Sequence, residues 1–261
     1  MKRTKDVQGG EAARIKVIKR GAVGEIRLNE PRVLNAMGPE WPEEMRFAIE
    51  EVRKDPEVRV VLLTGEGKSF SSGMNLTSLG RGEIPIRWFH ENEHVFRSLE
   101  TLEKPVICGI RGYCLGGGLQ VAIACDVRIA AEDAILGLPA VREAFIPGMS
   151  TYRLPRLIGM GHARHLILSG QNISAEEAYR IGLVNKVVPS DKLEGELDAW
   201  TNVYLDVPRS SIEYSKRLSN LSYDLPFEEF LEEFDRAAEV VISTEEHRAA
   251  RRTWLERRGR D

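Results

Sequence analysis

Short apolar runs alternate with glycine-rich turns and amphipathic segments over the first two-thirds of the chain. Residues 15–18 and 23–28 alternate apolar and polar side chains on either side of a short polar turn, which predicts a β-hairpin. Residues 59–64 and 105–110 are short apolar runs, and glycine-rich segments follow both. This pattern predicts two strands that end in tight turns.

Other segments repeat their apolar residues at helical spacing. Residues 41–53 and 86–102 each place a stripe of apolar side chains on one face, which predicts two amphipathic helices. Residues 117–125 are expected to form a helix after the second glycine turn, and residues 126–130 a strand. Residues 77–85 are expected to form a surface loop. The repeated order of strand, turn and helix predicts an α/β core.

The pattern changes after Pro189. Strand-forming residues become sparse, Glu and Arg become frequent, and proline separates the segments. Four helices are predicted here, over residues 190–205, 209–221, 226–242 and 244–258. They are expected to form a helical layer apart from the core, whereas residues 1–12 are expected to be a loose polar leader.

Composition narrows the class of protein. A net charge of −3 gives no basic surface of the kind that nucleic-acid binding requires. No apolar run reaches the length of about 18 residues that a membrane span needs, and no apolar segment of a secretory signal follows the charged start. The three cysteines, Cys108, Cys114 and Cys125, lack metal-type spacing. We therefore expect a cytoplasmic protein with reduced thiols.

The two glycine-rich turns, residues 65–76 and 111–120, carry the candidate chemistry. Glycine lets a ligand approach the backbone closely, and the first N–H groups of a helix have no partner within it. Two such N–H groups directed at one oxygen would form an oxyanion hole, which stabilises an enolate or a tetrahedral intermediate.

The same residues resemble the crotonase (enoyl-CoA hydratase/isomerase) superfamily. The resemblance starts at Leu34-Asn35-Ala36-Met37 and includes both glycine turns. It continues through Ile146-Pro147-Gly148 and ends near Gly182-Leu183-Val184, in order and with plausible spacing. It implies an α/β spiral of β-β-α repeats over residues 13–205. It also implies a C-terminal helical cap and oligomerisation region over residues 206–261, in a homotrimer or a dimer of trimers.

The resemblance also implies site residues. Met74 and Gly117 match the two backbone donors of the family's oxyanion hole, although tight turns without function have the same sequence pattern. The two glutamates that a hydratase of this family uses are absent, because Gln120 and Ala140 occupy their positions. Hydration needs a base that activates water and an acid that protonates the α-carbon. The usual hydration mechanism is therefore not expected.

Three other side chains are candidate proton donors or acceptors. A turn or short helix would return Glu143 to the side of Ala140, although a surface acid or a partner of Arg142 explains it as well. His90 and His94 lie on a helix that borders the acyl pocket in the family. Their segment, His90-Glu91-Asn92-Glu93-His94, matches the zinc motif H-E-x-x-H literally, but a zinc site would need a third ligand. The family uses no metal, so none is expected.

Lys68 and Lys216 are candidate contacts for coenzyme A, with Arg153 and Arg156 as further charges. The resemblance thus implies a lyase or isomerase of fatty acid metabolism that stabilises the enolate of an acyl-CoA thioester, with no cofactor beyond the coenzyme A of its substrate. Decarboxylation or isomerisation is favoured over hydration, and hydrolysis through Glu143 or a histidine stays open. The alternative is a non-catalytic acyl-CoA-binding or assembly subunit that has lost its acids.

Overall fold

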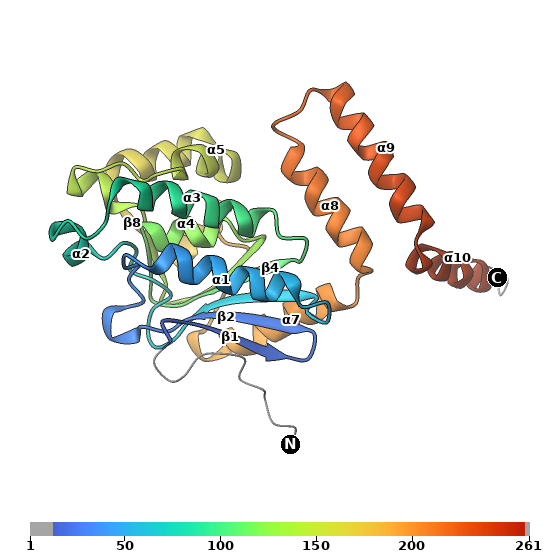
Figure 1. The fold of residues 1–261 in the computed structure, drawn as a ribbon, viewed down its shortest axis with the longest axis horizontal. Helices are drawn as coiled ribbons and strands as arrows, with labels where there is room; N and C mark the ends of the chain where they lie inside the picture. Colours follow the sequence, from blue (N-terminus) through green and yellow to red (C-terminus); the bar gives the residue numbers. More distant parts are fainter. Residues whose placement is uncertain (1–12, 259–261) are drawn as a thin grey trace, which may run out of the picture.

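The computed structural model describes residues 13–258, and the predicted leader over residues 1–12 lies outside this part. The centre of the described structure is a six-stranded sheet in the order β1-β2-β3-β4-β6-β9 (Figure 1). β1 and β2 form the predicted antiparallel hairpin, and every later pair in this sheet is parallel. A second sheet has the order β5-β7-β8.

The strands have these bounds: β1 Ile15–Arg20, β2 Val23–Leu28, β3 Val60–Gly65, β4 Val106–Ile110, β5 Tyr113–Leu115, β6 Val127–Ala131, β7 Ile135–Gly137, β8 Asn172–Ser174 and β9 Lys186–Val188. The α-helices are α1 Trp41–Lys54, α2 Leu76–Gly80, α3 Ile86–Glu100, α4 Gly117–Ile123, α5 Ser150–Ser169, α6 Ala175–Arg180, α7 Leu193–Leu205, α8 Arg209–Leu221, α9 Phe227–Ser243 and α10 Glu245–Arg258. Short 3-10 helices, η1 to η3, span Pro31–Val33, Pro139–Glu143 and Ser190–Lys192.

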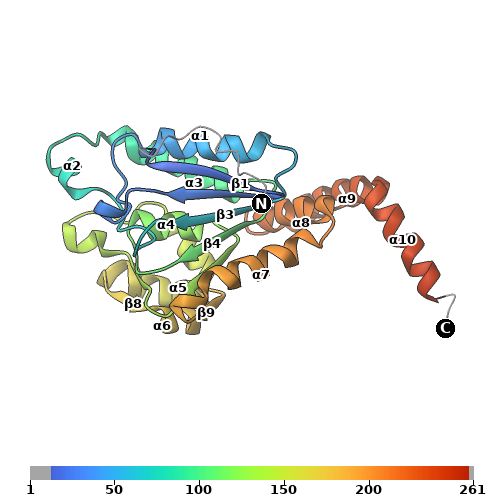
Figure 2. The same cartoon turned by 90° about the horizontal axis from the view of Figure 1, so that it is seen from below.

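The large sheet is buried on both faces, as near-continuous apolar strands require. In β3, Val61 and Leu63 face the larger core, to which α1, α3 and α4 contribute. Val60 and Leu62 point to the opposite face, because successive side chains of a strand alternate. α7 covers that second face, and Figure 2 shows the sheet between α7 and the layer of α1 and α3.

Glycine allows the two predicted turns to touch. A Cβ atom at Gly112 would lie 2.0 Å from the carbonyl oxygen of Lys68, and one at Gly73 would lie 2.5 Å from that of Leu115. Both glycines have positive φ, at +51° and +88°. The segment after β3 can therefore pair with β5, where the N–H of Leu115 donates to the carbonyl of Ser71. Two loops from adjacent parallel strands thus meet at one edge of the sheet.

Two local features differ from the sequence-based expectation. Residues 77–85 were expected to be a loop, but α2 (Leu76–Gly80) extends into this region, and the Asn75 side chain caps its start by accepting hydrogen bonds from the N–H groups of Thr77 and Ser78. α5 was not foreseen at all. It contains Pro155 and a non-helical residue, Gly159 (φ 76°), so its sequence lacks a clean helical pattern.

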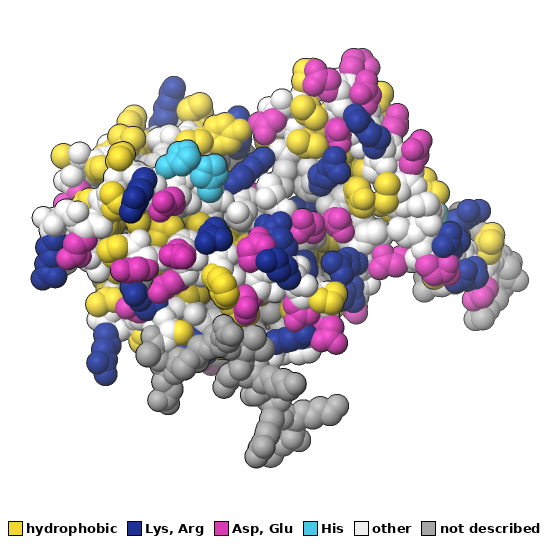
Figure 3. Space-filling view, in the orientation of Figure 1, with side chains coloured by type: hydrophobic (Ala, Val, Ile, Leu, Met, Phe, Trp, Pro, Cys, Tyr) yellow, Lys and Arg dark blue, Asp and Glu magenta, His cyan; other side chains and the backbone are white. Residues whose placement is uncertain are grey.

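The last three helices, α8 to α10, project from the body of the molecule in both ribbon views (Figures 1 and 2). Hydrophobic side chains interrupt the charged surface of this arm (Figure 3). Phe227, Leu231 and Phe234 of α9 are exposed. The assignment of residues 206–261 to a cap and oligomerisation region stays a prediction. Within residues 13–258, no helix is both long and apolar enough to cross a membrane.

Candidate active site

A cavity of about 560 Å³ opens beside the two glycine turns. Its wall is mainly apolar and comes from α2, α3, the start of α4, η2 and the start of α5. The following residues form its apolar part: Met37, Met74, Leu76, Leu79, Ile86, Trp88, Phe89, Phe96, Phe145, Ile146 and Met149. Such a concave apolar pocket with few polar groups is the usual form of a small-molecule site.

Met74 and Gly117 both line this cavity. Within residues 13–258, the N–H of neither residue donates to another protein group. Gly117 is the first residue of α4, where no acceptor exists inside the helix. Met74 is fixed from both sides, because Met37 donates to the carbonyl of Gly73 (2.8 Å) and accepts from the N–H of Asn75 (3.0 Å).

The two N–H groups are close together, and a side chain at position 117 would have little room. A Cβ atom at Gly117 would lie 3.7 Å from the nitrogen of Met74 and 2.5 Å from the sulfur of the buried Met37. Position 117 therefore favours glycine. Cys114 lies at the same turn, but it is fully buried and burial raises the pKa of its thiol, so it remains protonated at neutral pH. The backbone N–H groups of Met74 and Gly117 can therefore bind an anionic oxygen without help from a side chain.

The positions that the family resemblance assigns to acid and base also line the cavity. Gln120 follows Gly117 by three residues and thus lies on the same face of α4. Its Oε1 atom is buried and has no hydrogen-bond partner among the described residues. Ala140 lies on η2 and adds only a methyl group to the wall. Neither side chain can transfer a proton.

The other predicted proton donors lie in different places. Glu143 reaches the cavity because η2 brings it to the side of Ala140, yet its side chain is exposed. His90 lines the rim and is exposed as well. His94 does not line the cavity, although its ring packs against that of His90 with the centroids 4.5 Å apart. Only His90 and Glu143 of these three border the pocket.

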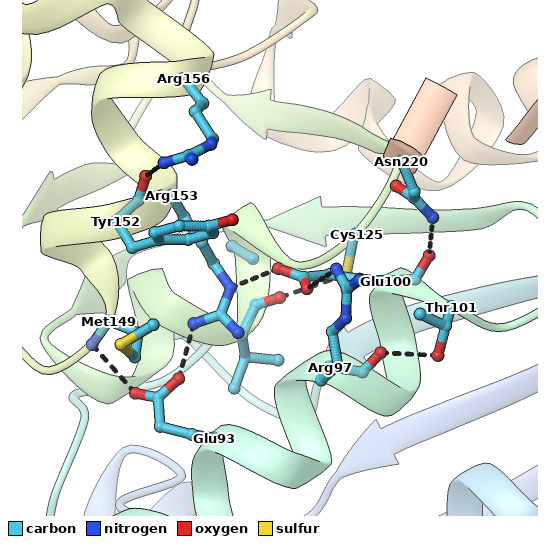
Figure 4. A network of polar contacts seen from close by, with 12 residues as sticks. Glu93, Arg97, Glu100, Thr101, Cys125, Met149, Tyr152, Arg153, Arg156 and Asn220 are labelled. Carbon is cyan, nitrogen blue, oxygen red and sulfur yellow. Dashed lines mark hydrogen bonds and ion pairs between the residues drawn. The ribbon is translucent and has the colours of Figure 1, made fainter. Parts of the chain in front are cut away.

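The sequence analysis missed Glu93, a carboxylate that also lines the cavity. Its Oε1 accepts from the N–H of Met149 (3.0 Å), and its Oε2 accepts from the guanidinium of Arg153 (2.6 Å). Arg153 also pairs with Glu100 (Figure 4). Burial disfavours the charge of Arg153, but its hydrogen bonds to Glu100 and Glu93 outweigh this, and its pKa lies above the ordinary value.

The candidate coenzyme A contacts lie away from the cavity wall. Lys68 is exposed on the turn after β3. The ammonium group of Lys216 donates to Asp126 (2.7 Å) and to the carbonyl oxygens of Leu99 and Lys104. Arg153 is held by two glutamates, as described above. A role of Lys68 or Lys216 in binding coenzyme A stays a prediction.

Comparisons with known proteins agree with this arrangement. The family model described as enoyl-CoA hydratase/isomerase matches residues 19–261. A short-chain-enoyl-CoA hydratase of Clostridium acetobutylicum is 38% identical, over 92% of this chain and 94% of the relative. A crotonyl-CoA hydratase of Syntrophomonas wolfei is 34% identical, over 89% and 91%. The crystal structure of an enoyl-CoA hydratase from Bacillus anthracis has a TM-score of 0.88 and 32% identity, over 94% of this chain and 97% of that one.

The family match and the fold define a crotonase-superfamily acyl-CoA enzyme. The chain belongs to the enoyl-CoA hydratase/isomerase superfamily. The predicted α/β crotonase fold with C-terminal helices is confirmed, and its strands form two sheets. The family implies an acyl-CoA substrate.

Proposed function

We propose that the protein binds an acyl-CoA thioester with its carbonyl oxygen between the N–H groups of Met74 and Gly117. The enolate of the thioester then forms without addition of water, in an isomerisation or a decarboxylation. The observation that carries this proposal is a pair of N–H groups with no partner within residues 13–258, in a cavity whose two family acid/base positions are Gln120 and Ala140.

The oxyanion hole suits any reaction that places negative charge on the thioester oxygen. The N–H groups are fixed by the backbone before substrate binds, so they need no reorganisation when charge develops. Loss of one donor from such a site typically reduces kcat by about 10² to 10³. The hole alone does not select among hydration, isomerisation and decarboxylation, because all three can pass through the same enolate.

The side chains that can transfer protons decide which of the three reactions the site supports. The relatives compared above carry the name hydratase, and hydration requires both a base for water and an acid for the α-carbon. An amide and a methyl group stand at the two family positions here. A decarboxylation obtains its electron pair from the C–C bond that releases CO2, and an isomerisation needs only one group that removes and returns a proton. Both reactions are compatible with Gln120 and Ala140.

The hydration of crotonyl-CoA tests this proposal. The unmodified protein should hydrate crotonyl-CoA far below ordinary enzyme rates of about 1 to 10³ s⁻¹. The double variant Gln120→Glu, Ala140→Glu should hydrate it faster, because it restores two carboxylates to the cavity wall. The matched control is Gln120→Glu, Ala140→Gln, which has the same side-chain size at position 140 but only one new carboxylate. Brisk hydration by the unmodified protein would contradict the proposal.

The assembly proposal rests on the C-terminal arm. Phe227, Leu231 and Phe234 repeat along α9 at spacings of three and four residues and are exposed in the single chain. An apolar stripe of this kind is normally covered. Because the family resemblance implies a trimer or a dimer of trimers, we propose that a second copy of the chain covers it.

A further inference from the structure

We propose that Glu93 is the proton-transferring base of the cavity, and that it moves a double bond of an uncharged enoyl thioester from the β,γ to the α,β position. This inference rests on the proposed function, because the base acts on a thioester held at Met74 and Gly117. It goes further by naming the group that moves the proton and by choosing isomerisation over decarboxylation.

Glu93 is held in place by donors alone. The backbone N–H of Met149 contacts one carboxylate oxygen, and the guanidinium of Arg153 contacts the other. Glu93 accepts a hydrogen bond in both contacts, as a carboxylate does. Each carboxylate oxygen can accept two hydrogen bonds, and only one on each is used by these contacts. Glu93 therefore keeps free accepting capacity while its orientation is fixed, as a preorganised base requires.

Gln120 links this carboxylate to the oxyanion hole. A Cβ atom at Gly148 would lie 2.7 Å from Oε1 of Gln120 and 3.0 Å from Oε1 of Glu93. The two side chains therefore end beside the same point of the cavity wall, which glycine leaves open. Gln120 extends from the first turn of α4, and Gly117 begins that helix. The carboxylate thus ends beside Gln120, one helical turn from Gly117, and on the proposed function this is the side that the α-carbon of the thioester must face.

The competing acids of the cavity lack such support. Glu143 is exposed, and within residues 13–258 no hydrogen bond or ion pair fixes its carboxylate. His90 is exposed, its ring packs on that of the exposed His94, and within residues 13–258 no side-chain hydrogen bond or ion pair holds it. A base that removes a proton from one particular carbon atom needs a fixed position, because small displacements lower the rate by large factors. Glu93 satisfies this condition.

The charge of the wall indicates the class of substrate. Among the described residues, no Lys or Arg side chain lines the cavity, and Arg153 is already paired with Glu93 and Glu100. The carboxylate of a malonyl-type acyl group would find no cation there and would meet Glu93, a like charge. An uncharged acyl chain fits the mainly apolar wall. The charge of the cavity wall therefore favours isomerisation over decarboxylation.

The proposed step balances within the protein and its substrate. The Glu93 carboxylate removes a proton from the α-carbon of a 3-enoyl thioester, and the C–H electron pair enters the enolate. The N–H groups of Met74 and Gly117 stabilise the enolate oxygen. The protonated Glu93 then returns the proton to the γ-carbon, where the π pair of the β,γ double bond forms the new C–H bond. The π pair between the thioester carbon and the α-carbon becomes the α,β double bond, and an electron pair of the enolate oxygen re-forms the thioester C=O bond. The carboxylate is regenerated, and no oxidant, reductant or water is consumed.

Conversion of 3-butenoyl-CoA to crotonyl-CoA by the full-length chain tests the role of Glu93. Glu93→Gln keeps the shape of the side chain but removes the base, so kcat should fall by about 10² to 10⁴. The matched control Glu91→Gln removes a charge from an exposed position on the same helix and should leave kcat unchanged. Dissociation constants for butyryl-CoA should be equal in the unmodified protein and in both variants.

Further readouts separate a base from a structural residue. The unmodified protein should exchange the α-protons of butyryl-CoA for deuterium in D2O, and Glu93→Gln should not. Glu93→Asp should restore part of the exchange. Loss of butyryl-CoA binding in Glu93→Gln would assign Glu93 a structural role and overturn the inference. Retained turnover in Glu93→Gln, or binding without exchange by the unmodified protein, would also overturn it while acyl-CoA binding stands. Failure of the unmodified protein to bind any acyl-CoA would instead refute the proposed function.

Discussion

Replacement of Gly117 isolates the contribution of a single backbone N–H. Proline removes this N–H, and Gly117 is the first residue of α4, where proline is well tolerated in helices. Proline also adds a Cβ atom, which would lie 2.5 Å from the sulfur of Met37. Gly117→Ala adds the same Cβ atom and keeps the N–H, so it is the matched control for crowding.

The difference in rate between Gly117→Pro and Gly117→Ala can be worked out from the surroundings of Gly117. In both variants the flexible Met37 side chain must shift to accept the Cβ atom, and this common cost cancels in their comparison. The remaining difference is the donor itself, whose hydrogen the proline Cδ replaces. Loss of one donor of an oxyanion hole typically lowers kcat by about 10² to 10³, or about 2.7 to 4 kcal/mol. Gly117→Pro should therefore be slower than Gly117→Ala by about this factor.

The assay compares the α-proton exchange of butyryl-CoA and the turnover of 3-butenoyl-CoA in the two variants. Circular dichroism and thermal unfolding verify that both variants are folded. Equal rates for folded Gly117→Pro and Gly117→Ala would show that the N–H of Gly117 does not stabilise the reacting oxygen. A slow alanine variant that matches the proline variant would assign the loss to crowding at Met37.

Two further predictions concern assembly and pH. Deletion of residues 208–261 should abolish the oligomer and expose apolar surface, whereas a mass of about 29.4 kDa for the intact chain in sedimentation would refute the assembly proposal. Burial of Lys104 lowers its pKa from 10.5 to about 8. Because the unfolded chain then binds more protons than the folded chain, the free energy of unfolding should rise between pH 8 and pH 10.5, and Lys104→Met should lack this contribution. Equal pH slopes of the two proteins in denaturant titrations would contradict this assignment.

Local signals in the sequence were sufficient for the hairpin, the amphipathic helices and the two glycine turns. The apolar runs of β3 and β4 predict buried strands, and the glycines after them predict close backbone contacts. The structure brings these turns together because β3 and β4 are neighbours in the sheet. The family resemblance, rather than local pattern, gave the spiral arrangement and singled out Met74 and Gly117.

Glu93 could not be found in this way, because its role depends on distant partners. Its two contacts, to Met149 and Arg153, join residues 56 and 60 positions apart. In the sequence it stands between two histidines, and the literal match to a zinc motif drew attention to His90 and His94 instead. A possible signal was its position three residues before Phe96 and four after Phe89, on the apolar stripe of α3. A charged side chain at the border of such a stripe needs a partner or a function.

The central claim is that the carbonyl oxygen of a bound thioester accepts hydrogen bonds from Met74 and Gly117. The infrared difference spectrum of butyryl-CoA labelled with ¹³C at the thioester carbonyl measures this contact without any need for turnover. Two hydrogen bonds to the oxygen polarise the C=O bond, so the carbonyl band of the bound ligand should shift to lower frequency than in water, and the shift should shrink in Gly117→Pro but remain in Gly117→Ala. A bound ligand whose carbonyl band stays at its frequency in water would contradict the account.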